Sequence, residues 1–355
     1  MKIGILTSGG DCAGLNAVMR GFGKAIANIS PGVEIYGIIG GYTGLINREY
    51  RQMKLSEFSG ILNMGGTILG TSRQPYKELL KFDENNKVAQ MKENYRKMDL
   101  DVLVVLGGRG THKTAALLSS EGLNVIGVPK TIDNDIWGTD FTFGFHSAVD
   151  VATECIDRIK TTAASHKRAM IVEIMGNKVG WLTLYAGIGG GADAILIPEI
   201  PYSIDAVVKY VGSCMNNKKK GYCVLAVSEG AIAQNEAHLS RKERMQKRAE
   251  RGENTLSNSI AKTIADKLDV ETRVVVPGHI QRGGSPNAYD RVICTQMGAY
   301  AAKLAAEKRF GVTVALKSDK MTANSLAEIP KKTNFVPPKH ELICAARDTG
   351  IFFGD

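Results

Sequence analysis

The chain has 355 residues, of which 44% are hydrophobic and 23% charged, a composition typical of globular proteins with about two domains. These proportions exclude a mostly disordered chain, and no apolar run reaches the ~18 residues that a membrane span requires. The net charge is +9, and much of the excess lies in residues 216–251. The densest part, 241–251, has no aromatic residues to stack on bases, so we expect a solvated face there and no nucleic-acid partner.

The predicted elements alternate between short Val/Ile/Leu strands and longer amphipathic helices. This alternation predicts an α/β fold with a mainly parallel sheet covered on both faces. The expected strands are Ile3–Thr7, Val33–Ile39, Leu103–Leu106, Val125–Val128, Met170–Glu173, Ala194–Ile197, Cys223–Val227, Arg273–Val276 and Thr313–Leu316. The expected helices include Gly14–Asn28, Ser147–Thr162, Ile204–Met215, Leu256–Leu268 and Tyr289–Ala306.

The N-terminus and the cysteines indicate the compartment. Met1–Thr7 is a short strand-like run followed by two glycines, not the longer apolar stretch of a signal peptide. The six cysteines are scattered without a C-x-x-C pair, so we expect reduced thiols and neither a disulfide framework nor a zinc site. Both features predict a cytoplasmic protein with no membrane partner.

Three glycine-rich loops lie at or after the ends of predicted strands. They are Thr7–Asn16, Gly65–Arg73 and Leu106–Thr111. Such loops expose backbone N–H groups, and a helix start behind them adds partial positive charge, so together they predict a phosphate-bearing ligand. None matches the G-x-G-x-x-G of dinucleotide-binding proteins or the G-x-x-x-x-G-K-[ST] of P-loop enzymes, which disfavours both classes.

Two further loops carry polar side chains with catalytic potential. Pro129–Asp135 presents two carboxylates two residues apart, which can hold Mg²⁺ and accept a hydroxyl proton. The alternative is an Asp-rich turn with no catalytic role. Pro277–Pro286 places a histidine and an arginine three residues apart among glycines, a combination suited to a phosphate monoester. His112, His146, His238 and His340 are expected to be structural.

In this order, the segments resemble the phosphofructokinase family. The matching segments are Thr7–Asp11, Gly65–Thr67, Pro129–Asp135, Glu173–Gly176 and Gly278–Pro286. The resemblance spans residues 1 to about 320. It implies phosphoryl transfer to the 1-hydroxyl of fructose 6-phosphate, with Mg²⁺ as cofactor, in glycolysis.

The resemblance also implies roles for individual residues. Asp133 matches the general base, Thr131 lies beside it, and Asp135 matches a second carboxylate near the metal and the sugar. The donor residues implied are Gly10, Tyr42, Arg73, Gly108, Arg109, Gly110 and Thr111. The sugar-phosphate residues implied are Arg168, Met175, Gly176, Glu229, Arg273, His279 and Arg282, the last two at the 6-phosphate.

Two residues bear on the phosphoryl donor. Gly110 stands where pyrophosphate-using relatives usually carry Asp, and its small size favours ATP. Lys130 is common in pyrophosphate users, although some ATP users also have it. We therefore expect ATP and keep pyrophosphate as the alternative.

Two departures from the family pattern raise another alternative. Arg109 replaces an acidic residue that helps to hold Mg²⁺, and a guanidinium cannot ligate a metal. Asn177 replaces an arginine thought to stabilise the moving phosphoryl group. A further hypothesis is therefore that the chain is a weakly active regulatory subunit that binds sugar phosphate. The presence of Asp133 and Thr131 argues against it.

The resemblance implies two similar α/β lobes with the chain crossing between them. We expect a donor lobe of 1–140 plus about 281–320, and a sugar-phosphate lobe of 141–280 plus about 321–355. Arg168 and Arg273 match arginines that reach a neighbouring subunit's site, which implies a homo-oligomer, usually a tetramer, with shared sites. Arg20, Lys24 and Asp193 partly match an effector site, and 241–253 resembles an insertion.

Overall fold

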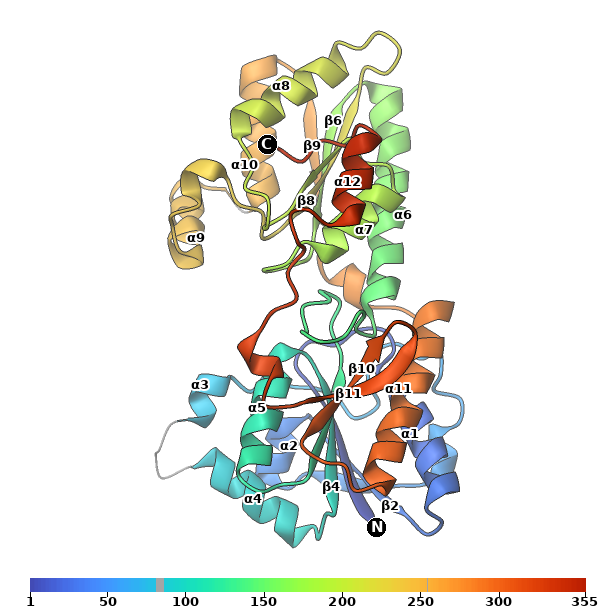
Figure 1. Cartoon of the computed structure of the whole chain (residues 1–355). Coiled ribbons are helices and arrows are strands. Elements are labelled where there is room, and N and C mark those ends of the chain that lie inside the picture. The colour runs from blue at the N-terminus through green and yellow to red at the C-terminus, as the bar shows by residue number, and fades with distance from the viewer. Residues whose placement is uncertain (81–85, 254) are drawn as a thin grey trace. The chain divides into compact units, whose positions relative to one another are not determined.

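A computed structural model of the chain describes residues 1–80, 86–253 and 255–355 and divides into two compact units (Figure 1). Unit 1 comprises Met1–Ser147 and Arg282–Asn334, and unit 2 comprises Ala148–Gln281 and Phe335–Asp355. The boundaries expected from the sequence were 140/141, 280/281 and 320/321. The last lies further on in the structure because β11 pairs with β10 as an antiparallel hairpin and so extends the sheet of unit 1.

Unit 1 is a seven-stranded sheet in the order β11-β10-β5-β4-β1-β2-β3. The pairs β10–β11 and β2–β3 are antiparallel, and the other neighbours are parallel. Its strands are β1 (Lys2–Ser8), β2 (Glu34–Ile38), β3 (Tyr50–Met53), β4 (Val102–Gly107), β5 (Val125–Pro129), β10 (Val312–Lys317) and β11 (Lys320–Ser325). Its helices are α1 (Leu15–Ile29), α2 (Tyr42–Asn47), α3 (Tyr76–Leu79), α4 (Lys87–Lys97), α5 (Arg109–Ser120) and α11 (Ala288–Ala306).

Helices cover both faces of the unit 1 sheet (Figure 1). On one face α2, α4 and α5 contribute to an apolar cluster with the central strands. On the other face α1 and α11 pack closely together. Glycines permit this approach, because a Cβ at Gly298 would lie 2.4 Å from the Val18 carbonyl oxygen and one at Gly21 would lie 2.8 Å from that of Thr295.

Unit 2 is a four-stranded parallel sheet in the order β7-β8-β6-β9. Its strands are β6 (Ala169–Ile174), β7 (Ala194–Leu196), β8 (Cys223–Ser228) and β9 (Thr272–Val275). Its helices are α6 (Phe145–His166, which begins in unit 1), α7 (Trp181–Gly189), α8 (Ile204–Met215), α9 (Arg241–Glu250), α10 (Leu256–Leu268) and α12 (Glu341–Asp348). Side chains of α8 and α10 pack in one apolar cluster with β6, β7 and β8.

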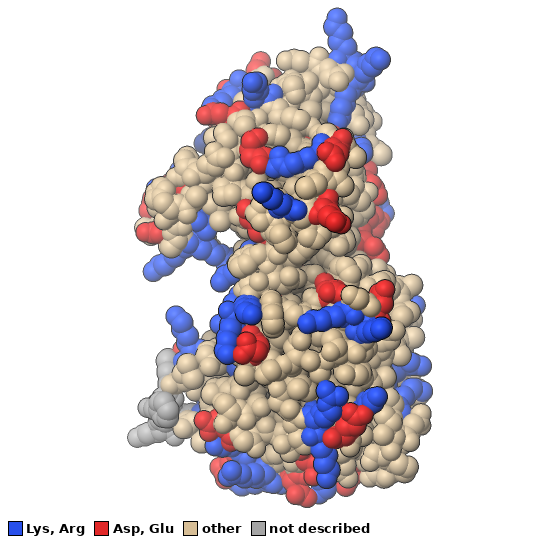
Figure 2. Space-filling view, in the orientation of Figure 1, with Lys and Arg blue, Asp and Glu red and all other residues tan. Residues whose placement is uncertain are grey.

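The basic segment forms α9, which projects from the body of unit 2 (Figure 1). The Ser240 side chain accepts a hydrogen bond from Glu243 N (3.3 Å), and the Glu243 carboxylate accepts one from Ser240 N (2.6 Å). This capping box starts the helix without help from the core. None of the ten described residues of α9 is buried, and Lys and Arg side chains gather over it in Figure 2, as expected for a solvated face.

The predicted α/β class with mainly parallel sheets is confirmed, and all nine predicted strands are present within one or two residues of their expected ends. The sequence did not predict β3 and β11. Both are sheet-edge strands with largely exposed or half-exposed side chains, so neither shows the continuous apolar run of a buried strand. Among the described helices, none is both long and apolar enough to cross a bilayer.

Candidate active site

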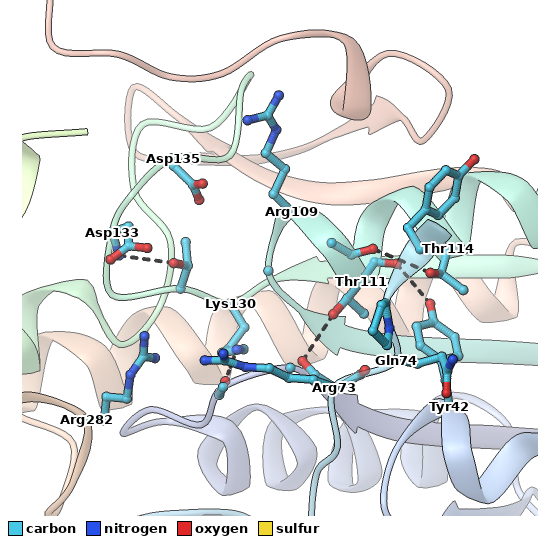
Figure 3. A pocket seen from close by; sticks show the side chains of 18 residues that line it. Tyr42, Arg73, Gln74, Arg109, Thr111, Thr114, Lys130, Asp133, Asp135 and Arg282 are labelled. Carbon is cyan, nitrogen blue, oxygen red and sulfur yellow. Dashed lines mark hydrogen bonds between the residues drawn. The ribbon is translucent and has the colours of Figure 1, made fainter. Parts of the chain in front are cut away.

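A cavity of about 400 Å³ opens in unit 1 at the carboxyl ends of three neighbouring strands, β5, β4 and β1 (Figure 3). Ligands of parallel α/β sheets bind at this edge because the loops that leave the strands converge there. The cavity is lined by Ser8, Gly9, Gly10, Tyr42, Arg73, Gln74, Pro75, Tyr76, Gly108, Arg109, Gly110, Thr111, Thr114, Lys130, Thr131, Asp133, Asp135 and Arg282.

The loop after β1 is fixed by neighbouring backbone. Gly9, which has φ +89°, donates from its N–H to Ser72 O (3.0 Å), and its carbonyl oxygen accepts from Thr71 Oγ1 (2.7 Å). A Cβ on Gly10 would lie 3.0 Å from Arg282 Nη1 and 3.5 Å from Arg73 Nη2. A glycine here therefore lets two guanidinium groups lie against the loop backbone.

The loop after β4 leads directly into α5, whose N-terminus faces the cavity (Figure 3). A Cβ on Gly107 would overlap the Thr111 side chain at 2.3 Å. Thr111 Oγ1 donates to Ser8 O (3.1 Å), and Thr111 O accepts from the Tyr42 hydroxyl (3.0 Å). These contacts fix the first turn of α5, whose residues line the cavity, and a helix N-terminus at this place favours an anion.

His112 supports this loop from behind. One ring nitrogen lies 3.0 Å from Gly108 O and the other 2.9 Å from Thr313 Oγ1. Burial lowers the pKa of His112 to about 4, so the ring is neutral at physiological pH. Its burial and these two partners support the structural role expected for His112.

Four cationic side chains and two carboxylates line the cavity, an excess of two positive charges (4 − 2). Within the described part of the chain, the buried Nε atoms of Arg109 and Arg282 have no hydrogen-bond partner, although Arg282 Nη1 donates to Asp11 O (3.1 Å). Burial lowers the pKa of Lys130, whose ammonium group donates to Gly10 O. Buried donors without partners, in a cavity of net positive charge, indicate an anionic ligand.

The loop after β5 carries the carboxylates. Asp133 N donates to Thr131 Oγ1 (3.1 Å), and Thr142 Oγ1 donates to Thr131 O (2.7 Å). Burial, and next the nearby Asp135 carboxylate, raise the pKa of Asp133 to about 6, against the opposing effect of Arg282 and Lys130. A carboxylate that titrates this close to neutrality can accept a proton efficiently at physiological pH.

The chemistry of these donors fits Mg²⁺ bound together with a phosphorylated ligand. Among the described residues, no three His, Cys, Asp or Glu side chains gather to hold a metal by themselves. Asp133 and Asp135 are however two oxygen donors beside an anion-binding cavity. Mg²⁺ is commonly held by one or two carboxylates plus substrate phosphates, so the site suits an ion that arrives with its ligand.

Three expected sugar-site residues gather in unit 2, beyond the ends of β6 and β8. Gly176 N donates to the Glu229 carboxylate (3.4 Å), and Met175 N donates to Gln281 Oε1 (3.3 Å). Gly176 has φ +139°, and its loop runs close to Gly230, where a Cβ would lie 2.4 Å from Asn177 O. The loops after β6 and β8 thus form one polar surface.

Two expected arginines of unit 2 share one carboxylate. Arg168 Nε lies 2.5 Å from a Glu271 oxygen, and Arg273 pairs with the other oxygen of the same group. The hydrogen bond from Arg168 lowers the pKa of Glu271. Because one carboxylate balances two guanidinium groups, a positive charge remains for an anion. His279 lies exposed in the short 3₁₀ helix Gly278–Arg282.

The structure brings all the expected donor and catalytic residues together in the unit 1 cavity. Arg282, which the resemblance implied at the 6-phosphate, also lines this cavity. Sequence reasoning missed Gln74, Pro75, Tyr76 and Thr114. Gln74, Pro75 and Tyr76 follow Arg73 directly, so a prediction that extended the second glycine-rich loop by three residues would have included them. Thr114 lies one helical turn beyond Gly110, on the same face of α5.

An anion-binding cavity on parallel strands, with a carboxylate that titrates near neutrality, defines a class of enzymes that act on phosphorylated ligands. A family model described as Phosphofructokinase matches residues 2–305. The ATP-dependent 6-phosphofructokinase of Spirochaeta thermophila is 50% identical over 357 residues, covering 99% of this chain and 97% of that protein. The chain belongs to the phosphofructokinase family, and it is accordingly a phosphotransferase.

Two further comparisons define its neighbours. The pyrophosphate–fructose 6-phosphate 1-phosphotransferase of Amycolatopsis methanolica is 40% identical over the full length of both proteins. The crystal structure of Pichia pastoris phosphofructokinase in the T-state matches with a TM-score of 0.79 and 30% identity; the match covers 98% of this chain and 36% of that one. The family resemblance inferred from the motifs is confirmed, and relatives using either donor are similar to the chain.

Proposed function

We propose that this chain transfers the γ-phosphoryl group of ATP to the 1-hydroxyl of fructose 6-phosphate and forms fructose 1,6-bisphosphate in glycolysis, in the cytoplasm. The observation that carries this proposal is the Asp133 carboxylate, whose pKa is raised to about 6 beside a cavity lined by four cations. The 50% identity to an ATP-dependent relative supports the choice of reaction.

In this proposal the donor phosphates lie on the backbone of Gly10, Gly108 and Gly110, at the N-terminus of α5. Arg73 and Arg109 neutralise their charge, and the free Nε of Arg109 supplies a hydrogen bond. Catalysis of phosphoryl transfer is largely positioning and charge neutralisation. When bound, Mg²⁺ held by Asp135 would add further neutralisation of phosphate charge.

Asp133 accepts the proton of the sugar hydroxyl as the oxygen attacks phosphorus. Thr131 orients Asp133, because its hydroxyl accepts the Asp133 N–H. The Arg282 and Lys130 charges stabilise the ionised form of the half-buried Asp133, so the base is available at neutral pH. General base catalysis of this kind contributes ~10² to 10⁴ in rate.

The sugar phosphate is an anion, and the candidate residues for it are Arg168, Met175, Gly176, Glu229, Arg273, His279 and Arg282. Support comes from the joined loops after β6 and β8 and from the two arginines that share Glu271. We further propose a homotetramer in which Arg168 and Arg273 complete a neighbouring subunit's site.

Gly110 supports ATP over pyrophosphate. It is exposed at the start of α5, and a Cβ there would meet nothing within 4 Å in the described residues. The adjoining space is therefore open to the α-phosphate of a nucleotide. Pyrophosphate is the second candidate donor, because the buried Lys130 ammonium adds a charge that a small dianion would use.

The deciding experiment measures fructose 1,6-bisphosphate formation by coupling to aldolase and NADH-dependent reduction of the products. The purified full-length protein receives fructose 6-phosphate with Mg²⁺ and either ATP or pyrophosphate. We expect kcat/KM to be at least ~10-fold higher with ATP, a difference of 1.4 kcal/mol in transition-state binding. Asp133→Asn is the control for contaminating kinase. A higher kcat/KM with pyrophosphate would make pyrophosphate the donor in place of ATP. Equal rates with both donors that persist in Asp133→Asn would refute the proposal.

A further inference from the structure

The loop after β6 lies in the middle of the carboxyl edge of the unit 2 sheet. β6 pairs in parallel with β8 on one side and with β9 on the other, so the loops that follow these three strands leave the sheet next to one another (Figure 1). Met175 and Gly176 follow β6, Glu229 follows β8, and His279 follows β9. The relative positions of these four sugar-phosphate candidates therefore depend on the contacts that join the three loops.

The loop after β8 holds the middle loop from one side. The Ser228 hydroxyl donates to Gly176 O (2.8 Å), and Glu229 N donates to Ile174 O (2.9 Å). The φ of Gly176 is +139°, which lies outside strand geometry, so its polar backbone groups need partners other than a strand ladder. Ser228, which is fully buried, and the Glu229 carboxylate supply them.

Gln281 holds the same loop from the side of β9. It lies in the 3₁₀ helix Gly278–Arg282 and is only 2% exposed, whereas His279 and Ile280 are exposed. Its Oε1 accepts a hydrogen bond from Met175 N (3.3 Å), and its Nε2 donates to Gly278 O (3.1 Å). One carboxamide, which has both an acceptor and a donor, thus joins the loop after β6 to the helix that carries His279.

We propose that Gln281 is a positioning residue for the sugar phosphate, an inference that rests on the proposed function. The buried Gln281 side chain fixes the spacing between the loop of Met175 and the helix of His279. Binding groups must be held close to their productive geometry to act together on one ligand. Loss of the carboxamide should therefore weaken the binding of fructose 6-phosphate. The donor residues belong to unit 1, so the affinity for ATP should not change.

The kinetic test compares the full-length wild type with Gln281→Met in the coupled assay with ATP and Mg²⁺. Methionine is unbranched and similar in length, so it fills the volume of glutamine without its hydrogen bonds. We expect the KM for fructose 6-phosphate to rise about 10-fold, because the variant leaves two backbone groups without this partner. The kcat and the KM for ATP should change by less than about twofold, as expected when only substrate binding is lost.

Gln234→Met is the matched control. Gln234 also lies in a 3₁₀ helix of unit 2, Gln234–Glu236, and its Nε2 donates to a backbone carbonyl oxygen, that of Pro201 (3.2 Å). Because Gln234 makes its bond away from the loop after β6, this variant should leave both KM values and kcat unchanged. A general effect of removing a glutamine side chain from unit 2 would appear in both variants.

Amide hydrogen exchange, read by mass spectrometry, tests the contact itself. A peptide that covers residues 173–177 should exchange faster in Gln281→Met than in the wild type, because Met175 N–H has lost its acceptor. Gln234→Met should not change this peptide. If thermal melts show that Gln281→Met does not fold, Gln281→Asn replaces it with the same expected results, because its carboxamide is one carbon too short to reach both partners.

The possible outcomes separate this inference from the proposed function. An unchanged KM for fructose 6-phosphate in a folded Gln281 variant would overturn the positioning role and leave the proposed function standing. Equal increases in the KM values of both substrates, or a fall in kcat alone, would also overturn it. A wild-type protein that does not turn over fructose 6-phosphate with either donor would refute the proposed function, and this inference with it.

Discussion

Replacement of Gly110 by aspartate tests how the cavity selects its donor. Gly110 is the second residue of α5, with open space around its Cβ position among the described residues, so the new side chain fits without moving its neighbours. An acidic group in a first helical turn stabilises by about 0.3–1 kcal/mol, so the Tm should hold or rise slightly. Any loss of ATP use would then arise from charge and occupancy, not from misfolding.

The magnitude follows from Coulomb's law. A carboxylate about 5 Å from an α-phosphate repels it by roughly 1 kcal/mol in water and 3 kcal/mol at an effective dielectric constant of 20. The kcat/KM for ATP should therefore fall by about 10-fold or more, since 1.4 kcal/mol is tenfold. Pyrophosphate lacks the α-phosphate and should lose less.

The coupled assay compares wild type, Gly110→Asp and Gly110→Asn with both donors. Asparagine matches aspartate in size without its charge, so it separates crowding from repulsion. We expect Gly110→Asn to lose less ATP activity than Gly110→Asp. Unchanged ATP kinetics in a folded Gly110→Asp protein would show that this loop does not hold the α-phosphate, and would remove the main support for ATP over pyrophosphate.

Four further predictions concern the base, the cations, the oligomer and the core. Asp133→Asn should lower kcat by ~10² to 10⁴. Because burial raises the pKa of Asp133 to about 6, wild-type kcat/KM should fall as pH drops below about 6. Ionisation of this acid opposes folding for the same reason, so in thermal melts Asp133→Asn should be more stable than the wild type above about pH 6 but not at about pH 4. Arg109→Met should raise the KM for ATP by about 10-fold through loss of a charged hydrogen bond; a higher activity in Arg109→Asp would instead show the arginine to be an impairment. Mixed oligomers of Arg273→Ala and Asp133→Asn chains should recover activity, and none recovered in verified mixtures would argue against shared sites. Asp290→Ala should destabilise by about 3 kcal/mol in urea unfolding, because the buried carboxylate accepts hydrogen bonds from Gly144 N (3.0 Å), Ser147 N (2.7 Å) and Ser147 Oγ (2.5 Å); an unchanged urea midpoint would contradict this.

The sequence predicts the buried parallel strands because their apolar runs are local. The order of the strands is not local: β1 lies between β4 and β2, and β10 joins β5 from almost 190 residues further along the chain. Crossover order of this kind is set by how helices pack on the sheet, so periodicity predicts the class of fold but not its topology.

The candidate site shows the same division. Glycine-rich loops at strand ends identify Gly10, Gly108 and Gly110, since their role depends on their own backbone. Arg282 could not be placed in this way, because its contact with Asp11 joins residues 271 apart in sequence. The raised pKa of Asp133 could not be predicted from the sequence either, because burial by the folded loops is the main cause of the shift.

The pairing of α1 with α11 has a consequence for the protein as it leaves the ribosome. The face of α1 that packs on α11 is complete once Ile29 has been made, but its partner ends at Ala306. At about 5–20 residues per second, translation of the intervening segment takes tens of seconds. When β9, the last strand of unit 2, has been synthesised, unit 1 still lacks α11, β10 and β11. The nascent chain therefore presents an uncovered apolar helix face for most of its synthesis.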